Sequence, residues 1–290
     1  MTRMLAALVA VLVLMAAVVQ AASAKKPLRG NAASAGAIEV GIASAQAQGD
    51  GSTASATASC PHGTKAAGGG FDAPSSAGVI ALVYESVKLR QDAWRASVQL
   101  FDPGEPDSVT LTTYVYCRAH FPATKTSTDT VPTTGELQIG PTASATCPRA
   151  DSVVAGGFHM PPPLGAVSVT DLFFDSLRSG ASGWDARVVT GPAGPSAVTS
   201  EAYCSKSLSA PTEVLARSAA IGLDLQTGTA SAACPAGTTP AAGGFAQPES
   251  NVVSFFFVYS SMRVGESWQV SGLHSGSEPA VALTGAAYCA

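Results

Sequence analysis

One frame recurs three times in this chain and places two of the six cysteines in each copy. It runs from Cys-Pro through Gly-Gly-Phe, a Ser followed two places later by a basic residue, and a Trp, to a closing Thr-x-x-x-Tyr-Cys. The first cysteines, Cys60, Cys147 and Cys234, are spaced by 87 residues each time. A fixed period of this kind indicates one supersecondary unit used three times.

The repeated positions are Cys60, Phe71, Ser86, Lys88, Trp94, Thr112, Tyr116 and Cys117 in copy one; Cys147, Phe158, Ser176, Arg178, Trp184, Thr199, Tyr203 and Cys204 in copy two; and Cys234, Phe245, Ser261, Arg263, Trp268, Thr284, Tyr288 and Cys289 in copy three.

The cysteine spacing predicts disulfide bonds. The two cysteines of each copy are 57, 57 and 55 residues apart, and the sequence has no Cys-x-x-Cys pair or Cys/His cluster. In an oxidising compartment, an even number of regularly spaced cysteines is typical of a disulfide framework. The simplest connectivity closes each copy on itself, with the pairs Cys60 and Cys117, Cys147 and Cys204, and Cys234 and Cys289.

The first two dozen residues have the pattern of a secretory signal peptide. A basic Arg3 precedes an apolar run over 4–19, and an A-x-A cleavage pattern follows at 22–24. The run is also about as long as a short spanning helix, so an uncleaved membrane anchor is the alternative interpretation. We predict a signal peptide over 1–24 and a secreted protein that has no membrane span after cleavage.

The charge content excludes nucleic acid as a partner. Lys and Arg number 16 against 20 Asp and Glu, and charged residues make up only 12% of the chain, about half the usual share. Binding to a phosphate backbone requires clustered Lys and Arg. The cluster at Lys25, Lys26 and Arg29 falls in a segment over 25–36 that we predict to be a flexible, Ala-rich leader.

Alternating apolar residues predict strands, and no segment of the mature chain has helical periodicity. Strands are expected before each first cysteine, at 38–42, 137–139 and 221–225. The clearest register is in the strand that holds the repeated Ser, and the three copies match there. In copy one, Leu82, Tyr84, Ser86 and Lys88 are expected on one face. The predicted fold class is all-β, with three tandem antiparallel repeats that are each closed by one disulfide.

The repeat also predicts the domain organisation. We expect repeat 1 over 37–117, repeat 2 over 135–204 and repeat 3 over 219–290, joined by polar linkers at 118–134 and 205–218. The repeats fit either sandwich-like beads on linkers or one pseudo-threefold β-prism. The length of the linkers slightly favours beads, because connections within a domain are usually shorter.

Two repeated features have a structural interpretation and a functional one. The Gly pairs at 69–70, 156–157 and 243–244 predict a bulge or a close backbone approach, since no phosphate-binding Lys-Ser/Thr follows them. The repeated Phe, Trp and Tyr residues predict a shared core. Outward-facing Trp rings that stack on sugars are the alternative.

The sequence shows no catalytic pattern. The four histidines, His62, His120, His159 and His274, occupy unrelated places in the frame, and there is no Gly-x-Ser-x-Gly elbow or paired-carboxylate motif. We therefore expect no enzyme activity, no cofactor and no metal site.

Lys88, Arg178 and Arg263 are the one charged feature found in every copy. They are interpreted as surface cations that pair with an acid such as Glu85 or Asp175. The alternative is a ligand site, in which the three cations offer equivalent contacts to an anionic or hydroxyl-rich ligand.

The frame resembles the repeat of vitelline membrane outer layer proteins. The resemblance lies in the Cys-Pro-x-Gly at 60–63 and 234–237, the Gly-Gly-Phe and the closing Tyr-Cys, while 147–150 lacks the Gly. It implies a secreted β-prism of three repeats whose closing cysteine is bridged to the first. The Ala-rich makeup is also similar to that of secreted bacterial Cys-repeat proteins, a resemblance that implies no activity.

These observations predict a secreted, non-catalytic repeat protein with a structural or binding role at the cell exterior. A carbohydrate-binding module of lectin type is the alternative, and a secreted hydrolase or inhibitor is the third possibility. Expected partners are envelope polysaccharide or another extracellular protein.

Overall fold

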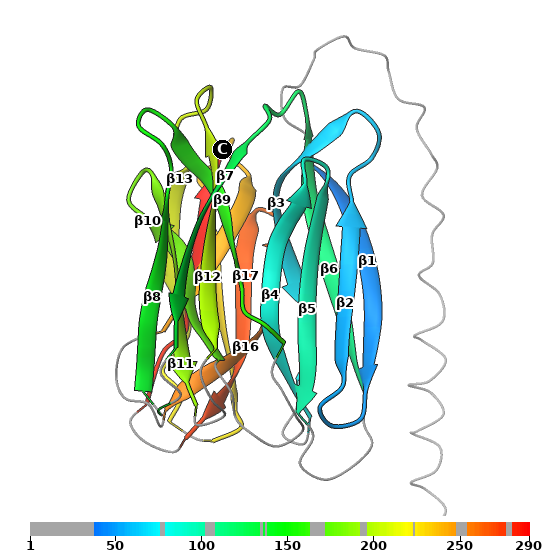
Figure 1. Ribbon diagram of the computed structural model, residues 1–290, viewed down its shortest axis with the longest axis vertical. Helices are drawn as coiled ribbons and strands as arrows, with labels where there is room; N and C mark the ends of the chain where they lie inside the picture. The colour runs from blue at the N-terminus through cyan, green and yellow to red at the C-terminus, as the bar shows by residue number, and fades with distance from the viewer. Residues whose placement is uncertain are drawn as a thin grey trace, which may run out of the picture. The chain divides into compact units, whose positions relative to one another are not determined.

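The computed structural model describes residues 38–75, 79–101, 108–133, 136, 138–162, 172–191, 196–222, 224–247, 254–276 and 280–290. The signal peptide predicted over 1–24 and the leader predicted over 25–36 lie outside these residues. The described residues belong to one compact unit, and their regular elements are all strands (Figure 1). The all-β prediction is confirmed.

Each repeat supplies six strands. Repeat 1 contains β1 (Glu39–Gln48), β2 (Thr53–Ser59), β3 (Thr64–Asp72), β4 (Ile80–Arg90), β5 (Ala93–Phe101) and β6 (Ser108–Ala119). Repeat 2 contains β7 (Lys125–Pro132), β8 (Gln138–Thr146), β9 (Ser152–His159), β10 (Leu172–Ser179), β11 (Gly183–Thr190) and β12 (Ala197–Ser205). Repeat 3 contains β13 (Thr212–Arg217), β14 (Thr227–Ala233), β15 (Pro240–Ala246), β16 (Phe255–Val264), β17 (Ser267–Ser275) and β18 (Thr284–Cys289).

The strands form three six-stranded antiparallel sheets, and every sheet combines two repeats. Sheet A has the order β1-β6-β3-β16-β17-β14, sheet B the order β2-β5-β4-β9-β12-β7, and sheet C the order β13-β18-β15-β10-β11-β8. Each repeat therefore gives half of one sheet and half of another, and the three repeats close a ring. This arrangement is the prism and excludes separate beads, because beads would keep their strands to themselves.

Two predictions of strand and linker positions are wrong. The segments expected to be linkers, 118–134 and 205–218, contain the edge strands β7 and β13, which pair with β12 and β18. Where the strand was expected at 221–225, the described residues contain a single bridge, between Ile221 and Val281. Polar and Pro-containing composition suggested a linker, but an edge strand exposes one face to water and tolerates that composition.

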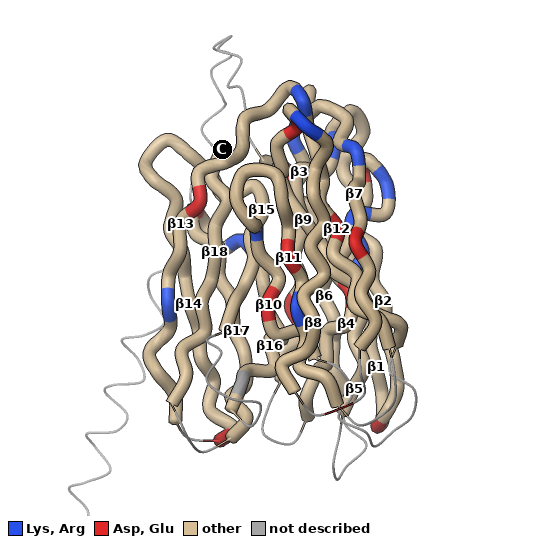
Figure 2. The backbone as a smooth tube through the Cα atoms, turned by 60° about the vertical axis from the view of Figure 1, so that its left-hand side comes forward, with Lys and Arg blue, Asp and Glu red and all other residues tan. Residues whose placement is uncertain are grey.

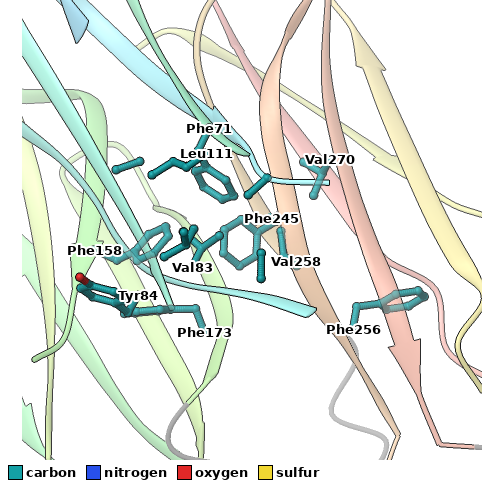
Figure 3. Close-up of a cluster of buried hydrophobic side chains, with 14 of the residues drawn as sticks. Phe71, Val83, Tyr84, Leu111, Phe158, Phe173, Phe245, Phe256, Val258 and Val270 are labelled. Carbon is teal, nitrogen blue, oxygen red and sulfur yellow. The ribbon is translucent and has the colours of Figure 1, made fainter. Parts of the chain in front are cut away.

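The three repeats meet around the repeated phenylalanines. The rings of Phe71 and Phe158 lie 6.2 Å apart and those of Phe158 and Phe245 lie 5.8 Å apart, both with edge-to-face geometry (Figure 3). All three side chains are buried. The interpretation of the repeated aromatics as core is confirmed, since the three tryptophans and the three repeated tyrosines are buried as well.

The Gly pairs make the seams between repeats possible. A Cβ on the first Gly of each pair would lie inside the indole of its own repeat's tryptophan, as at Gly156 and Trp184. A Cβ on the second Gly would collide with a carbonyl of the next strand in the sheet, as at Gly157 and Ser86. The predicted close approach is confirmed, and it has two components, one within a repeat and one between repeats.

The repeated Trp, Ser and Tyr residues join neighbouring repeats by hydrogen bonds. Each indole Nε1 donates to the repeated Ser of its own repeat at 3.0 Å. Each tyrosine hydroxyl accepts from the backbone N–H of another repeat's basic residue: Tyr203 from Lys88, Tyr288 from Arg178 and Tyr116 from Arg263, at 2.6–2.7 Å. The tyrosine ring also packs edge-on against the adjoining tryptophan. We call each set of these tyrosine contacts a tyrosine clamp. Three equivalent clamps link the repeats in a ring.

The predicted disulfides are confirmed. Cys60 is bonded to Cys117, Cys147 to Cys204 and Cys234 to Cys289. Closing a loop of such length stabilises the native state by roughly 4 kcal/mol in the chain-entropy model. The bridges lie close to the point where each repeat begins and ends.

Replacing Gly156 by Ala should lower the free energy of unfolding by about 3 kcal/mol, because the methyl group would force the Trp184 indole out of its site. Gly285→Ala is the matched control, since its Cβ would meet its nearest neighbours at 3.4 Å, an ordinary contact. Urea unfolding of both variants measures the difference. Equal effects of the two changes would contradict this account of the Gly pair.

Tyr116→Phe should lower the free energy of unfolding by about 1–2 kcal/mol, because the Arg263 N–H would remain buried without its acceptor. Tyr259→Phe serves as the control, since the Tyr259 hydroxyl makes no hydrogen bond to the part of the chain that the structure describes. Thermal and urea unfolding compare the two. If Tyr116→Phe lowers the free energy of unfolding no more than Tyr259→Phe does, the Tyr116–Arg263 hydrogen bond does not stabilise the contact between repeats.

Candidate functional site

The repeated cations lie in three different sheets and bind protein groups. Lys88 Nζ donates to the Ala66 carbonyl at 2.8 Å and to Thr124 Oγ1 at 3.0 Å. Arg178 Nη1 donates to the Pro211 carbonyl at 2.6 Å. Thr124 and Pro211 stand immediately before β7 and β13, so both cations hold the chain where it enters the next repeat.

Arg263, the third repeated cation, binds groups of its own hairpin instead. Its Nε donates to the Gly265 carbonyl at 2.7 Å, and its guanidinium lies 3.6 Å from Glu266. The pairing of the repeated cations with Glu85 or Asp175 is wrong, because those acids bind Arg95 and Arg187 instead. Each of the three cations binds protein groups. A ligand contact at Lys88, Arg178 and Arg263 stays a prediction.

A second set of polar residues lies on the outer faces of the sheets, one position away from the repeated ones. The repeated Ser and Phe residues point inward, so the residue before each Ser and the residue after each Phe point outward. At these places sheet B has Glu85 and His159, whereas sheet A has Ser260 and Asp72. At these places beside the repeated Ser and Phe, the outer face therefore differs from sheet to sheet while the inner face stays the same.

In sheet B the outward residues form one continuous row across all six strands. Strand register aligns Ser55, Ser97, Glu85, His159, Thr199 and Thr130, from β2 at one edge to β7 at the other. Strands lie about 4.8 Å apart, so the row spans about 24 Å. We call this set the sheet-B row.

A groove of about 530 Å³ lies over the sheet-B row. Every member of the row lines it, together with Tyr84, Arg95 and Ala197. Met160, Pro161 and Pro162, which follow β9, form an apolar wall. Charged residues are otherwise sparse along the sheets and gather near the end where β3 and β7 are labelled (Figure 2).

Glu85 is held by three protein donors. Arg95 donates from Nε at 2.8 Å and from Nη2 at 2.5 Å, and Ser97 Oγ donates at 2.5 Å. The hydrogen bonds that Arg95 donates to Glu85 raise the pKa of Arg95. The carboxylate and the guanidinium therefore neutralise each other at the centre of the groove.

The remaining polar groups of the groove are hydroxyls and one imidazole. Ser55 and Ser97 share a hydrogen bond of 2.8 Å, as do Thr130 and Thr199. His159 Nε2 is buried and has no hydrogen-bond partner among the described residues. Nearby, burial raises the pKa of Glu201, which accepts a hydrogen bond from the Tyr203 hydroxyl at 2.6 Å.

The charged and polar groups of the groove are mostly bonded to one another. The Glu85 carboxylate is ion-paired with Arg95, and in the part of the chain that the structure describes no hydroxyl is bonded to His159 Nε2. Among the described residues, no group of three or more His, Cys, Asp or Glu side chains is placed to hold a metal ion. What the groove offers is a line of hydrogen-bond donors and acceptors beside an apolar wall.

Comparison with known proteins gives no family. No protein-family model matches the chain, and no curated protein matches it either. The resemblance to vitelline membrane outer layer proteins therefore stays an interpretation of the frame. Within the described ranges, no helix has the length and apolarity needed to cross a membrane.

Sequence reasoning does not find this groove, because nearly all of its lining residues lie outside the repeated frame, Thr199 being the exception. In the sequence Glu85 is only a carboxylate without a pairing motif or an ion-pair partner for a repeated cation, and His159 is only a histidine outside the frame. Glu85 belongs to repeat 1 and His159 to repeat 2, so no pattern within one copy groups them.

Lys88 gives the fold a measurable pH dependence. Burial lowers the pKa of Lys88 from 10.5 to about 8, with a smaller contribution from Lys65. The unfolded chain thus binds more protons than the folded protein between these values, so the free energy of unfolding should rise with pH by up to about 1.4 kcal/mol per unit. Above pH 10 the buried tyrosines, whose pKa values are raised by burial, oppose this rise.

The rise should be measured by urea unfolding between pH 7.5 and 9.5. Lys88→Met should abolish it, whatever the variant's overall stability, whereas Lys125→Met at an exposed position should keep it. The same slope in Lys88→Met as in the unaltered protein would show that another group titrates.

Proposed function

We propose that this protein is a secreted, non-catalytic binding protein of the cell exterior, and that the sheet-B groove is its binding site. The observation that carries the proposal is the division between the two faces of the sheets. The repeated Phe, Trp, Ser and Tyr side chains serve the core or a seam. The groove in sheet B is instead built almost entirely from residues outside the repeated frame, Thr199 being the repeated residue among them.

The groove's chemistry favours the carbohydrate-binding alternative over a purely structural role. Its volume falls within the usual range for a small-molecule site, and polar groups converge beside an apolar wall. A purely structural subunit would need no such concentration of hydroxyl, imidazole and guanidinium groups on one sheet. Three disulfides are consistent with an oxidising, extracellular environment.

A blocking substitution tests this function. Ala197→Trp should fill the groove from β12 and reduce binding of the mature protein to isolated cell-envelope polysaccharide by at least tenfold. Ala246→Trp is the matched control, because Ala246 faces outward from sheet C at the position that His159 holds in sheet B. A sedimentation assay with both variants, folded by circular dichroism, gives the comparison.

Saturable binding that Ala197→Trp removes and Ala246→Trp retains would support the groove as the binding site. Binding that survives in both variants would place the site elsewhere. Absence of binding by the unaltered protein would favour the structural role and reject the binding function.

A further inference from the structure

We propose that the sheet-B groove binds an uncharged linear saccharide chain that lies across the strands and occupies several sugar units at once. The inference rests on the proposed binding function and deepens it by naming the ligand class and its orientation. It follows from the extent of the groove, from its unused hydrogen-bonding capacity and from its charge.

The extent of the groove indicates an extended ligand. Its lining includes at least one residue from each of the six strands of sheet B, from Ser55 on β2 to Thr130 on β7. A pocket for one terminal sugar would draw its lining from two or three neighbouring strands. A ligand that contacts the whole row must reach about 24 Å perpendicular to the strands.

The hydrogen-bonding capacity of the row fits sugar hydroxyls. Each Ser and Thr hydroxyl has one donor and two acceptor sites, so the pairs Ser55–Ser97 and Thr130–Thr199 keep capacity after bonding to each other. His159 also lines the groove, but its Nε2 is covered by protein atoms, so the hydroxyl groups carry the polar contacts to a ligand. A sugar hydroxyl both donates and accepts, and can therefore bond to either kind of group.

Arg95 adds a donor at the middle of the row. It gives Nε and Nη2 to Glu85, and its side chain remains 38% exposed. A guanidinium has five N–H groups, so it retains hydrogens that can reach a ligand in the groove.

The charge of the groove favours an uncharged chain. Arg95 and Glu85 neutralise each other, and a polymer with a charge on every unit would meet no matching line of opposite charges. Met160, Pro161 and Pro162 give an apolar wall on which the C–H faces of sugar rings can pack. The hydroxyl groups of the saccharide can therefore bond to the polar row, and its C–H faces can pack on the apolar wall.

The test is a length series measured by titration calorimetry. The probes are cello-, xylo-, manno- and malto-oligosaccharides of one to six units, with oligogalacturonates as the charged counterpart. For at least one neutral series, affinity should increase with each unit and level off at about four to six units, where the row is filled. The charged series should bind at least tenfold more weakly than the best neutral one.

A matched pair of threonine substitutions locates the contacts. Thr199→Val in the groove should weaken binding of the best hexasaccharide by about 5- to 10-fold, the effect of one lost hydrogen bond. Thr112→Val occupies the same place of the frame in sheet A and also loses one hydroxyl partner, Ser44. It should leave the affinity unchanged.

Three results would overturn the inference: equal affinity for one and six units, tighter binding of the charged series, or no binding of any neutral probe. Each can be separated from failure of the proposed function by the envelope-polysaccharide assay. If groove-dependent envelope binding persists while the neutral probes fail, the groove is a binding site for another ligand class. If envelope binding fails as well, the binding function itself is rejected.

Discussion

The seams between repeats are short, and each depends on a glycine that allows two backbones to come together. At the seam of sheet B only Glu85 and Ser86 pair with His159 and Phe158, and at the seam of sheet A the pairing is equally short. A Cβ at Gly157 would collide with the Ser86 carbonyl, so any larger residue would force these strands apart. Because each sheet is half one repeat and half another, these glycines lie where the two three-stranded halves of each six-stranded sheet join.

The close approach of the sheets also explains why the core has aromatic side chains at the axis and small side chains toward the sheet edges. The three Phe rings fill the space where the seams converge, and the indoles lie over the first Gly of each pair. Toward the edges, strands such as β2 bury only Ala54, Ala56 and Ala58, since the sheets approach each other closely there. Alanine contributes little apolar area, which makes the cross-links by disulfide and by tyrosine clamp more important to stability.

The sequence was sufficient to predict whatever the frame specifies: the all-β class, the disulfide pairs, the buried aromatics and the close approach at the Gly pairs. The sequence did not predict how the repeats combine. Ser86 and Phe158 belong to different repeats, and nothing in the repeated frame indicates that their strands pair. Polar composition predicts linkers where the edge strands β7 and β13 lie, because that composition reflects one exposed face. The groove cannot be predicted for a related reason: Glu85, His159 and Thr130 converge only after two repeats share a sheet.

The division between inner and outer faces also separates the residues of the core and seams from most residues of the groove that we propose as a binding site. A strand residue that faces outward can change without disturbing the clamp formed by its inward neighbour, as Glu85, Asp175 and Ser260 show beside the three repeated serines. The three sheets thus share the same interior residues, while the side chains on their outer faces differ from sheet to sheet. Sheet C places an Asp175–Arg187 pair where sheet A has Ser260 and Ser271, so its face is charged where that of sheet A is hydroxylic. Only a sheet that joins halves of two repeats can align Glu85 from one with His159 from the next, so the site in sheet B is a product of the ring itself.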